Sequence, residues 1–363
     1  MKKIILSVLI LVLLLSLTAC TEVLQMNQRL LVQGIGVDKA EEGFKICMQI
    51  LNLDQSTKEN KTTPKEVQTV SAFGETVGDA VENIKNQTGK KPLFSQSLVL
   101  IIGKEAAKAG VRSFIDFFIR HNEINPSVEV AVSEDKAENV LKAEFDEKII
   151  SAEEILSVLK SSHEYSSKLN FNFGNFINLL ESYSDAATHY LKIQKDAKGS
   201  KISSGEIAVF REDKFEGTLD NNESKGYLIL KGKAKSMTDI ALTKNDVKIT
   251  YVISDIYNNL EIKKEDDKYK ENIKIKVKAY VDESEKEIDL DENVEDIKIA
   301  IKERIQNLID KVISKSMYQY KADVLSFFKK FSEKFPNEAH PKEEFLDKFS
   351  YDLDLEVDLK LTK

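Results

Sequence analysis

The sequence is poor in the residues that cross-link, kink or break a chain. Its 363 residues include two cysteines, five prolines, fourteen glycines and no tryptophan. Two cysteines cannot supply the disulfide framework of a small secreted domain, and so little glycine and proline excludes a collagen-like or linker-dominated chain. Because 42% of the residues are hydrophobic, the chain can bury sizeable cores and is not disordered throughout. This length favours two or three domains.

Basic residues are fewer than acidic ones. The chain has 53 lysines and arginines against 61 aspartates and glutamates, a formal net charge of −8 at pH 7. Phosphate backbones repel an acidic chain, so nucleic acid is not expected as a partner. Loss of Lys2 and Lys3 with an N-terminal signal segment makes the remainder more acidic still.

Histidines are too few and too scattered to predict a metal site. The four are His121, His163, His189 and His340, and none lies four residues from another as in a helical zinc motif. The pairs that His121 and His163 form with nearby glutamates are interpreted as solvated polar positions. Cys47 alternates with apolar residues on a predicted strand, which is typical of a small buried side chain rather than a nucleophile. We predict no metal and no cofactor.

Motifs that hold phosphates or nucleophiles are missing too. Gly34 and Gly36 form a G-x-G sequence on a predicted strand, but position 39 is Lys39, so the dinucleotide-binding pattern is not completed. The sequence contains no Walker A loop, no G-x-S-x-G elbow and no C-x-x-C pair. We interpret the two glycines as positions of close backbone packing, and predict no catalytic residue and no enzymatic activity.

The N-terminus carries the most specific signal. Lys2 and Lys3 precede an uncharged run from Ile4 to Leu17, which is shorter than the roughly 20 residues of a membrane-spanning helix but typical of a signal peptide. Leu17-Thr18-Ala19-Cys20 then resembles a bacterial lipobox, whose cysteine receives diacylglycerol before cleavage. We predict a signal peptide over residues 1–19 and lipid attachment at Cys20. The two acyl chains of diacylglycerol would anchor the chain durably to a membrane. An ordinary signal peptide or an uncleaved anchor is the alternative.

The first half mixes short apolar strands with amphipathic helices. The pattern predicts a hairpin over 29–38 and 44–50, strands over 98–102, 128–132 and 191–194, and helices over 77–84, 111–120, 152–159 and 173–183. Residues 52–66 are polar and aperiodic, which predicts an exposed, mobile loop. The clearest break in composition lies at 196–201. We therefore predict an N-terminal α+β region over 20–198, which can itself divide into two domains, and a C-terminal α+β domain over 199–363.

The second half predicts strands over 207–210, 226–230, 247–252 and 273–279, then a long amphipathic helix over about 294–335. Residues 273–281 and 353–361 each alternate between an apolar and a charged face. We predict that they share one sheet whose apolar face packs on the helix; were they neighbours, their outward lysines and acids could pair. The alternative is that they lie in different sheets. The predicted fold class is α+β, multi-domain, with mixed or antiparallel sheets packed by helices, a long C-terminal helix and a final strand at a sheet edge.

Several segments, in order, resemble a known family. The lipobox followed by RLLVQGIGVDKAEEGFKICMQI, then PLFSQSLVLIIGKEAAKAGVRSFIDFFIRHNEI, SGEIAVFREDKFEGTL and ESKGYLIL, is similar to the Ger(x)C family, the C subunits of spore germinant receptors. The resemblance covers essentially the whole chain. Members often have Trp-Asp where this chain has Thr21-Glu22, and a histidine where Gln96 stands.

The resemblance implies a non-enzymatic, lipid-anchored subunit on the outer face of the spore inner membrane. It implies partners as well, the integral-membrane A and B subunits, with which the chain would assemble into a receptor for small nutrients. An extracytoplasmic solute-binding lipoprotein of a transporter is the alternative. An anchored hydrolase is a third hypothesis, which the missing nucleophile and metal motifs disfavour.

Overall fold

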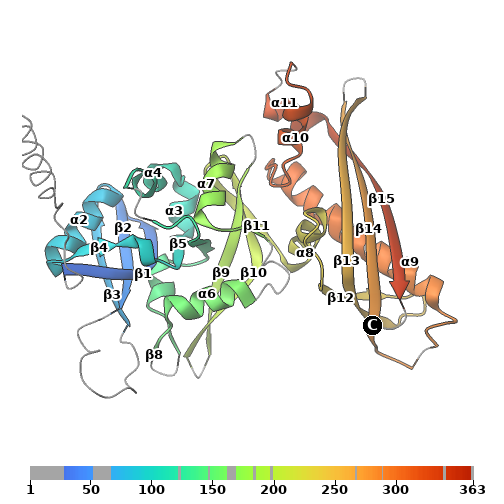
Figure 1. Ribbon diagram of the computed structural model, residues 1–363, viewed down its shortest axis with the longest axis horizontal. Coiled ribbons are helices and arrows are strands. Elements are labelled where there is room, and N and C mark those ends of the chain that lie inside the picture. Colours follow the sequence, from blue (N-terminus) through green and yellow to red (C-terminus); the bar gives the residue numbers. More distant parts are fainter. Residues whose placement is uncertain are drawn as a thin grey trace, which may run out of the picture.

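The computed structural model describes residues 28–51, 67–121, 124–145, 148–161, 169–182, 185–196, 199–265, 268–287, 289–337 and 341–360. The predicted signal peptide, Cys20 and the predicted loop over 52–66 lie outside these residues. The described elements form two bodies, each built on one β-sheet (Figure 1). The chain is α+β, as predicted.

The first sheet has eleven strands, with the main order β3-β2-β1-β5-β6-β9-β10-β7-β8. β5 lies between β1 and β6 and runs parallel to both, and all five of its residues are buried. The predicted hairpin is β1 and β2. The strands are β1 (Arg29–Lys39), β2 (Phe44–Leu51), β3 (Val67–Gly74), β4 (Lys91–Leu93), β5 (Val99–Gly103), β6 (Glu129–Ser133), β7 (Glu144–Phe145), β8 (Lys148–Ile149), β9 (Ala187–Asp196), β10 (Gly199–Arg211) and β11 (Lys214–Leu219).

Helices cover both faces of this sheet. Leu100 and Ile102 point into one core, which the helices α2 (Val77–Thr88), α3 (Lys104–Ala109), α4 (Arg112–His121) and α7 (Phe173–Glu181) close. Val99 and Ile101 point into the other core, under α5 (Ala137–Leu141) and α6 (Ala152–Ser161). The 3-10 helix η2 (Phe94–Gln96) precedes β5. A strand covered on both faces has no polar side, which explains the continuous apolar run of β5.

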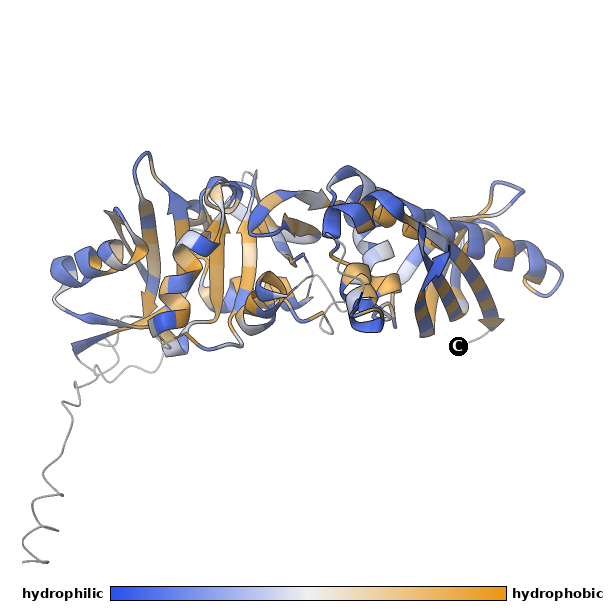
Figure 2. Ribbon diagram, turned by 90° about the horizontal axis from the view of Figure 1, so that it is seen from above, coloured by the Kyte–Doolittle hydropathy of each residue, from blue (hydrophilic) through white to orange (hydrophobic). Residues whose placement is uncertain are grey.

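The second body is a four-stranded sheet in the order β12-β13-β14-β15, with one face covered by helices. Figure 2 shows its strands striped in alternating hydrophobic and hydrophilic residues. The elements are α8 (Asn221–Leu230), β12 (Thr238–Leu242), β13 (Lys248–Glu265), β14 (Lys268–Ser284), α9 (Val294–Ile313), α10 (Phe327–Lys334), α11 (Lys342–Lys348) and β15 (Phe349–Lys360). β14 and β15 lie in one sheet, as predicted, where they are neighbours and run parallel.

Two predicted elements are wrong. The segment 226–230 is not a strand but the end of α8, which begins with a capping box between Asp220 and Glu223. A short apolar run alone does not separate a buried helix from a strand. The predicted helix over 294–335 is interrupted: α9 continues as the π-helical turn η4 (Ser314–Gln319), and the chain bends before α10. Lys321 and Ser326 take positive φ at the bend, with values of 52° and 64°.

The predicted division between residues 198 and 199 remains a prediction, but sheet pairing crosses it. β10 pairs with β9 along its length, and β11 pairs with β10. The first sheet therefore extends to Leu219. The hydrophobic core of the second body also reaches back to this sheet, since it includes Ala187, Ile207, Val209 and Leu219.

Candidate functional site

The residues singled out in the sequence do not converge on one site. Cys47 is fully buried, and burial raises the pKa of its thiol to about 12, which leaves it inert as a nucleophile. Gly34 and Gly36 are positions of close packing, because a Cβ on Gly34 would lie 2.9 Å from Leu141 Cδ2. Both predictions from the sequence are confirmed. Gln96 is exposed at the end of η2.

His189 is the one histidine whose side chain the structure describes. It is buried on β9, its Nε2 lies 3.5 Å from Glu129 Oε2, and its ring contacts Phe171 edge to face. His163 and His340 lie outside the described residues, as does the side chain of His121. Within the described ranges, no group of three or more histidine, cysteine or acidic side chains is placed to hold a metal ion.

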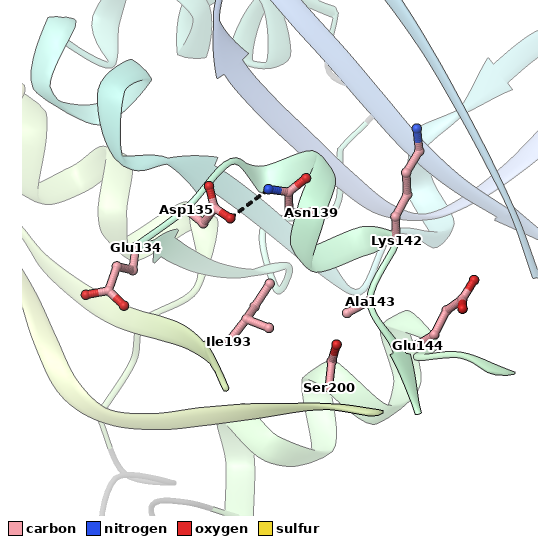
Figure 3. Close-up of a pocket in the computed structure, with 8 residues that line it drawn as sticks. All are labelled: Glu134, Asp135, Asn139, Lys142, Ala143, Glu144, Ile193 and Ser200. Atoms are coloured by element: carbon pink, nitrogen blue, oxygen red, sulfur yellow. Dashed lines mark hydrogen bonds between the residues drawn. The ribbon is translucent and has the colours of Figure 1, made fainter. Parts of the chain in front are cut away.

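A polar pocket of about 760 Å³ opens beside α5, where β6, β7, β9 and β10 meet. Ala143, Ile193 and Ser200 face one another at its centre, whereas Lys142 extends away from them (Figure 3). Lys142 is instead paired with Glu138 at 2.6 Å. The remaining residues of the lining are Glu134, Asp135, Asn139 and Glu144. Ser200 has no histidine beside it among the described residues of this lining.

An ionic cluster of two buried acids and two partly buried lysines links the two bodies, and we call it the joint: Asp185, Lys231, Asp323 and Lys342. Asp185 precedes β9 in the first body and is 1% exposed. Its carboxylate accepts hydrogen bonds from the backbone N–H of Asp323 at 2.6 Å and of Glu212 at 2.9 Å, and it pairs with Lys342. Sites 138 residues apart in the chain are thereby connected by charge-assisted hydrogen bonds.

Asp323 holds the start of α10 in place. Its two carboxylate oxygens accept hydrogen bonds from the backbone N–H of Phe327 and of Phe328, both at 2.8 Å. Burial raises the pKa of Asp323 to about 6, although these bonds and the ammonium groups of Lys342 and Lys231 oppose the rise. The same burial lowers the pKa of Lys231 to about 8. Tyr320 adds a direct link between the bodies, because its hydroxyl donates to the Thr218 carbonyl of β11.

Glu271 is a third buried acid, and it interacts electrostatically with Asp323 of the joint. It is 0% exposed on the apolar face of β14, between Tyr269 and Ile273, and neither carboxylate oxygen has a hydrogen-bond partner in the part of the chain that the structure describes. Burial raises the pKa of Glu271 to about 7; the ammonium group of Lys330 opposes this rise and the carboxylate of Asp323 adds to it. A carboxyl with this pKa exchanges a proton near neutral pH.

None of these acids is predicted from the sequence, because 61 acidic residues make any single one inconspicuous. For Glu271 a signal did exist. Extending the alternation of Ile273, Ile275 and Val277 by one step back along the strand places position 271 on the apolar face. No comparable signal marks Asp185 or Asp323, whose contacts depend on the packing of the two bodies.

Comparisons with known proteins agree with each other. A family model described as the spore germination protein N-terminal domain matches residues 23–193, and one described as spore germination B3/GerAC-like, C-terminal, matches residues 205–363. The chain is 22% identical over 234 residues to the "Putative spore germination protein YfkR" of Bacillus subtilis (strain 168). That match covers 60% of this chain and 59% of the relative.

The fold is similar to that in the crystal structure of the GerBC protein. The TM-score is 0.60 at 16% sequence identity, over 90% of this chain and 96% of that chain. Among the described residues, no helix is long and apolar enough to cross a membrane.

Proposed function

Because the chain belongs to the spore germination family whose N-terminal and GerAC-like C-terminal domains it matches, we propose that it is the C subunit of a nutrient germinant receptor. The observation that carries the proposal is the match of both domain models, in order, over residues 23–193 and 205–363. The subunit would act in spore germination as a binding and structural component, without enzymatic activity.

A structural role is consistent with how the buried ionisable groups are used. Asp185 and Asp323 bind backbone N–H groups and lysines that hold the two bodies together. Asp239, on β12, is engaged in a similar way by Lys225 at 2.6 Å and by Arg304 at 2.7 Å. These acids stabilise the tertiary structure, and a rigid scaffold of this kind suits a subunit that positions partners.

We further propose that the subunit is anchored by diacylglycerol on Cys20 to the outer face of the spore inner membrane. The lipobox sequence supports this placement. Two acyl chains are sufficient for a durable anchor, at about 0.8 kcal/mol per buried CH₂ group.

Substitution of Cys20 tests the anchor. Cys20→Ala removes the thiol that is alkylated, so we expect an unprocessed precursor and weakened germination with an unchanged fold. Mass spectrometry of the mature N-terminus checks this, and Cys47→Ala is the matched control because it removes the other, buried thiol. An unmodified N-terminal residue, or cleavage elsewhere, contradicts the anchor.

Isolation of the subunit from spore membranes tests the assembly. We expect the tagged protein to co-purify with two polytopic membrane proteins, the A and B subunits. Deletion of the chain should abolish the response to one class of nutrient and leave the response to others intact. Co-purification with an ATPase and a permease would instead support the solute-binding alternative.

A further inference from the structure

The last strand of the second sheet has a long free edge. β15 is twelve residues long and pairs with β14 on one side, in a register without interruption from Phe349 to Lys360. It is the last strand in the order β12-β13-β14-β15 (Figure 1). Nowhere in the described part of the chain does a strand pair with its other side. The opposite edge of the sheet, β12, is only five residues long.

This edge lacks several of the features that usually prevent strand addition. Natural edge strands are protected by proline, by a bulge, by short length, by a covering helix or loop, or by charged side chains. The outward side chains of β15 are mostly acidic, which disfavours a second acidic strand but not a basic one. β15 contains no proline, and its pairing with β14 has no bulge. Its inward positions are all apolar, and four of them remain only partly buried against the core: Tyr351, Leu353, Val357 and Leu359. An additional strand would cover these side chains.

The outward face indicates the charge of that strand. Exposed lysines of β14 lie opposite exposed acids of β15 in register: Lys274 with Asp354, Lys276 with Glu356, and Lys278 with Asp358. Lys276 and Glu356 form an ion pair at 2.7 Å. On the far side of β14, Lys278 lies opposite Asp255 of β13. The other two lysines, Lys276 and Lys274, lie opposite uncharged residues of β13. The outward acids of β15 thus have lysines on the β14 side, and basic residues on an added strand would pair with them on the other side.

We propose that the free edge of β15 receives an extended segment of a partner polypeptide, with lysine or arginine at its outward positions and aliphatic residues at its inward ones. Backbone hydrogen bonds would supply affinity and the alternating side chains specificity. A second copy of this chain fits poorly, because β15 beside β15 would set acidic rows against each other. The inference depends on the sheet alone and is independent of the receptor assignment.

Peptide binding to the full chain, purified in detergent, tests the proposal. The probe is a synthetic peptide of alternating lysine and valine, of the same twelve-residue length as β15. One control peptide replaces lysine by glutamate, and a second carries N-methyl groups on the backbone amides of one edge. We expect the lysine peptide to bind and both controls to fail.

Charge variants locate the binding. Asp354→Lys combined with Glu356→Lys should weaken binding of the lysine peptide about tenfold or more. Asp255→Lys, an exposed charge reversal two strands away, should weaken peptide binding less. Thermal melts of all variants check that they fold. Three results would overturn the proposal: no binding of the lysine peptide, equal binding of the N-methylated peptide, or a stable dimer of the chain that the peptide does not dissociate.

Discussion

At the scale of single residues, the unusual feature is a carboxyl group in a hydrophobic core that has no hydrogen-bond partner among the described residues. Glu271 is fully buried, and its pKa is raised by burial from an ordinary value near 4.5 to about 7. Below pH 4.5 the carboxyl is neutral in both the folded and the unfolded chain. Between these two values the folded chain binds more protons than the unfolded chain, so stability falls as the pH rises.

Glu271→Gln keeps the side chain neutral at every pH. We expect the natural chain to lose free energy of unfolding between about pH 4.5 and pH 7, and the variant to lack the part due to Glu271, on the order of 1–3 kcal/mol. Urea denaturation from pH 5 to pH 8 measures this. Asp323, whose pKa is about 6, gives the variant a smaller remaining decrease in the free energy of unfolding as the pH rises. Lys231, whose pKa is about 8, affects stability only at higher pH.

The control for this experiment is Glu283→Gln, an exposed carboxylate near the far end of the same strand, β14. It should leave the pH dependence as it is in the natural chain. Equal slopes for the natural chain and Glu271→Gln would show that the buried carboxyl does not titrate in this range.

At the scale of elements, the second body depends on the close approach of α8 and α9. Gly226 makes this approach possible, because a Cβ at this position would lie 2.1 Å from the Leu308 carbonyl oxygen and 2.9 Å from Val312 Cγ1. A backbone oxygen cannot rotate away as a flexible side chain can. The helices must therefore separate if the glycine is replaced.

We expect Gly226→Ala to destabilise the chain by about 1–3 kcal/mol, although alanine favours helices in general. Gly78→Ala in α2 is the matched control, since its Cβ would be 3.4 Å from the nearest atom, an ordinary contact with Phe117. Chemical denaturation should show little change or a small gain of stability for Gly78→Ala. A similar effect of the two substitutions would contradict the close approach.

At the scale of the whole molecule, the two bodies share a core and the ionic joint. Ile207 and Leu219 of the first sheet belong to the same hydrophobic cluster as Leu308 and Phe327 of the second body. Asp185 provides acceptors to Asp323 and Glu212 and a partner to Lys342. Coupling of this kind predicts that both bodies unfold together in one transition.

Asp185→Ala should uncouple them. Removal of this carboxylate leaves buried donors without an acceptor, at a cost of about 2–4 kcal/mol, and should divide a single calorimetric transition into two. Asp213→Ala, which removes an acceptor for the Arg112 N–H within the first body, is the control and should not divide it. Two transitions in the natural chain would show that the joint does not couple the bodies.

The sequence by itself determined the elements whose period is unambiguous. Strict alternation over 273–281 and 353–361 was enough to predict two strands and their apolar faces. That these strands are neighbours, with lysines opposite acids, is a finding of the structure. The hairpin over β1 and β2 and the inert, buried Cys47 were predictable for the same local reasons. The order of segments was enough to indicate the family.

Only the tertiary structure decided the features that depend on contacts between distant segments. The helical period continues through Tyr320, Val324 and Phe327, yet the helix stops, because the N–H of Asp323 bonds to Asp185 and its carboxylate begins α10. The segment 226–230 is helical because a capping box begins α8 and because α8 packs against α9. Which acids are buried is likewise invisible in a sequence, since desolvation is a property of the packed chain and not of the residue.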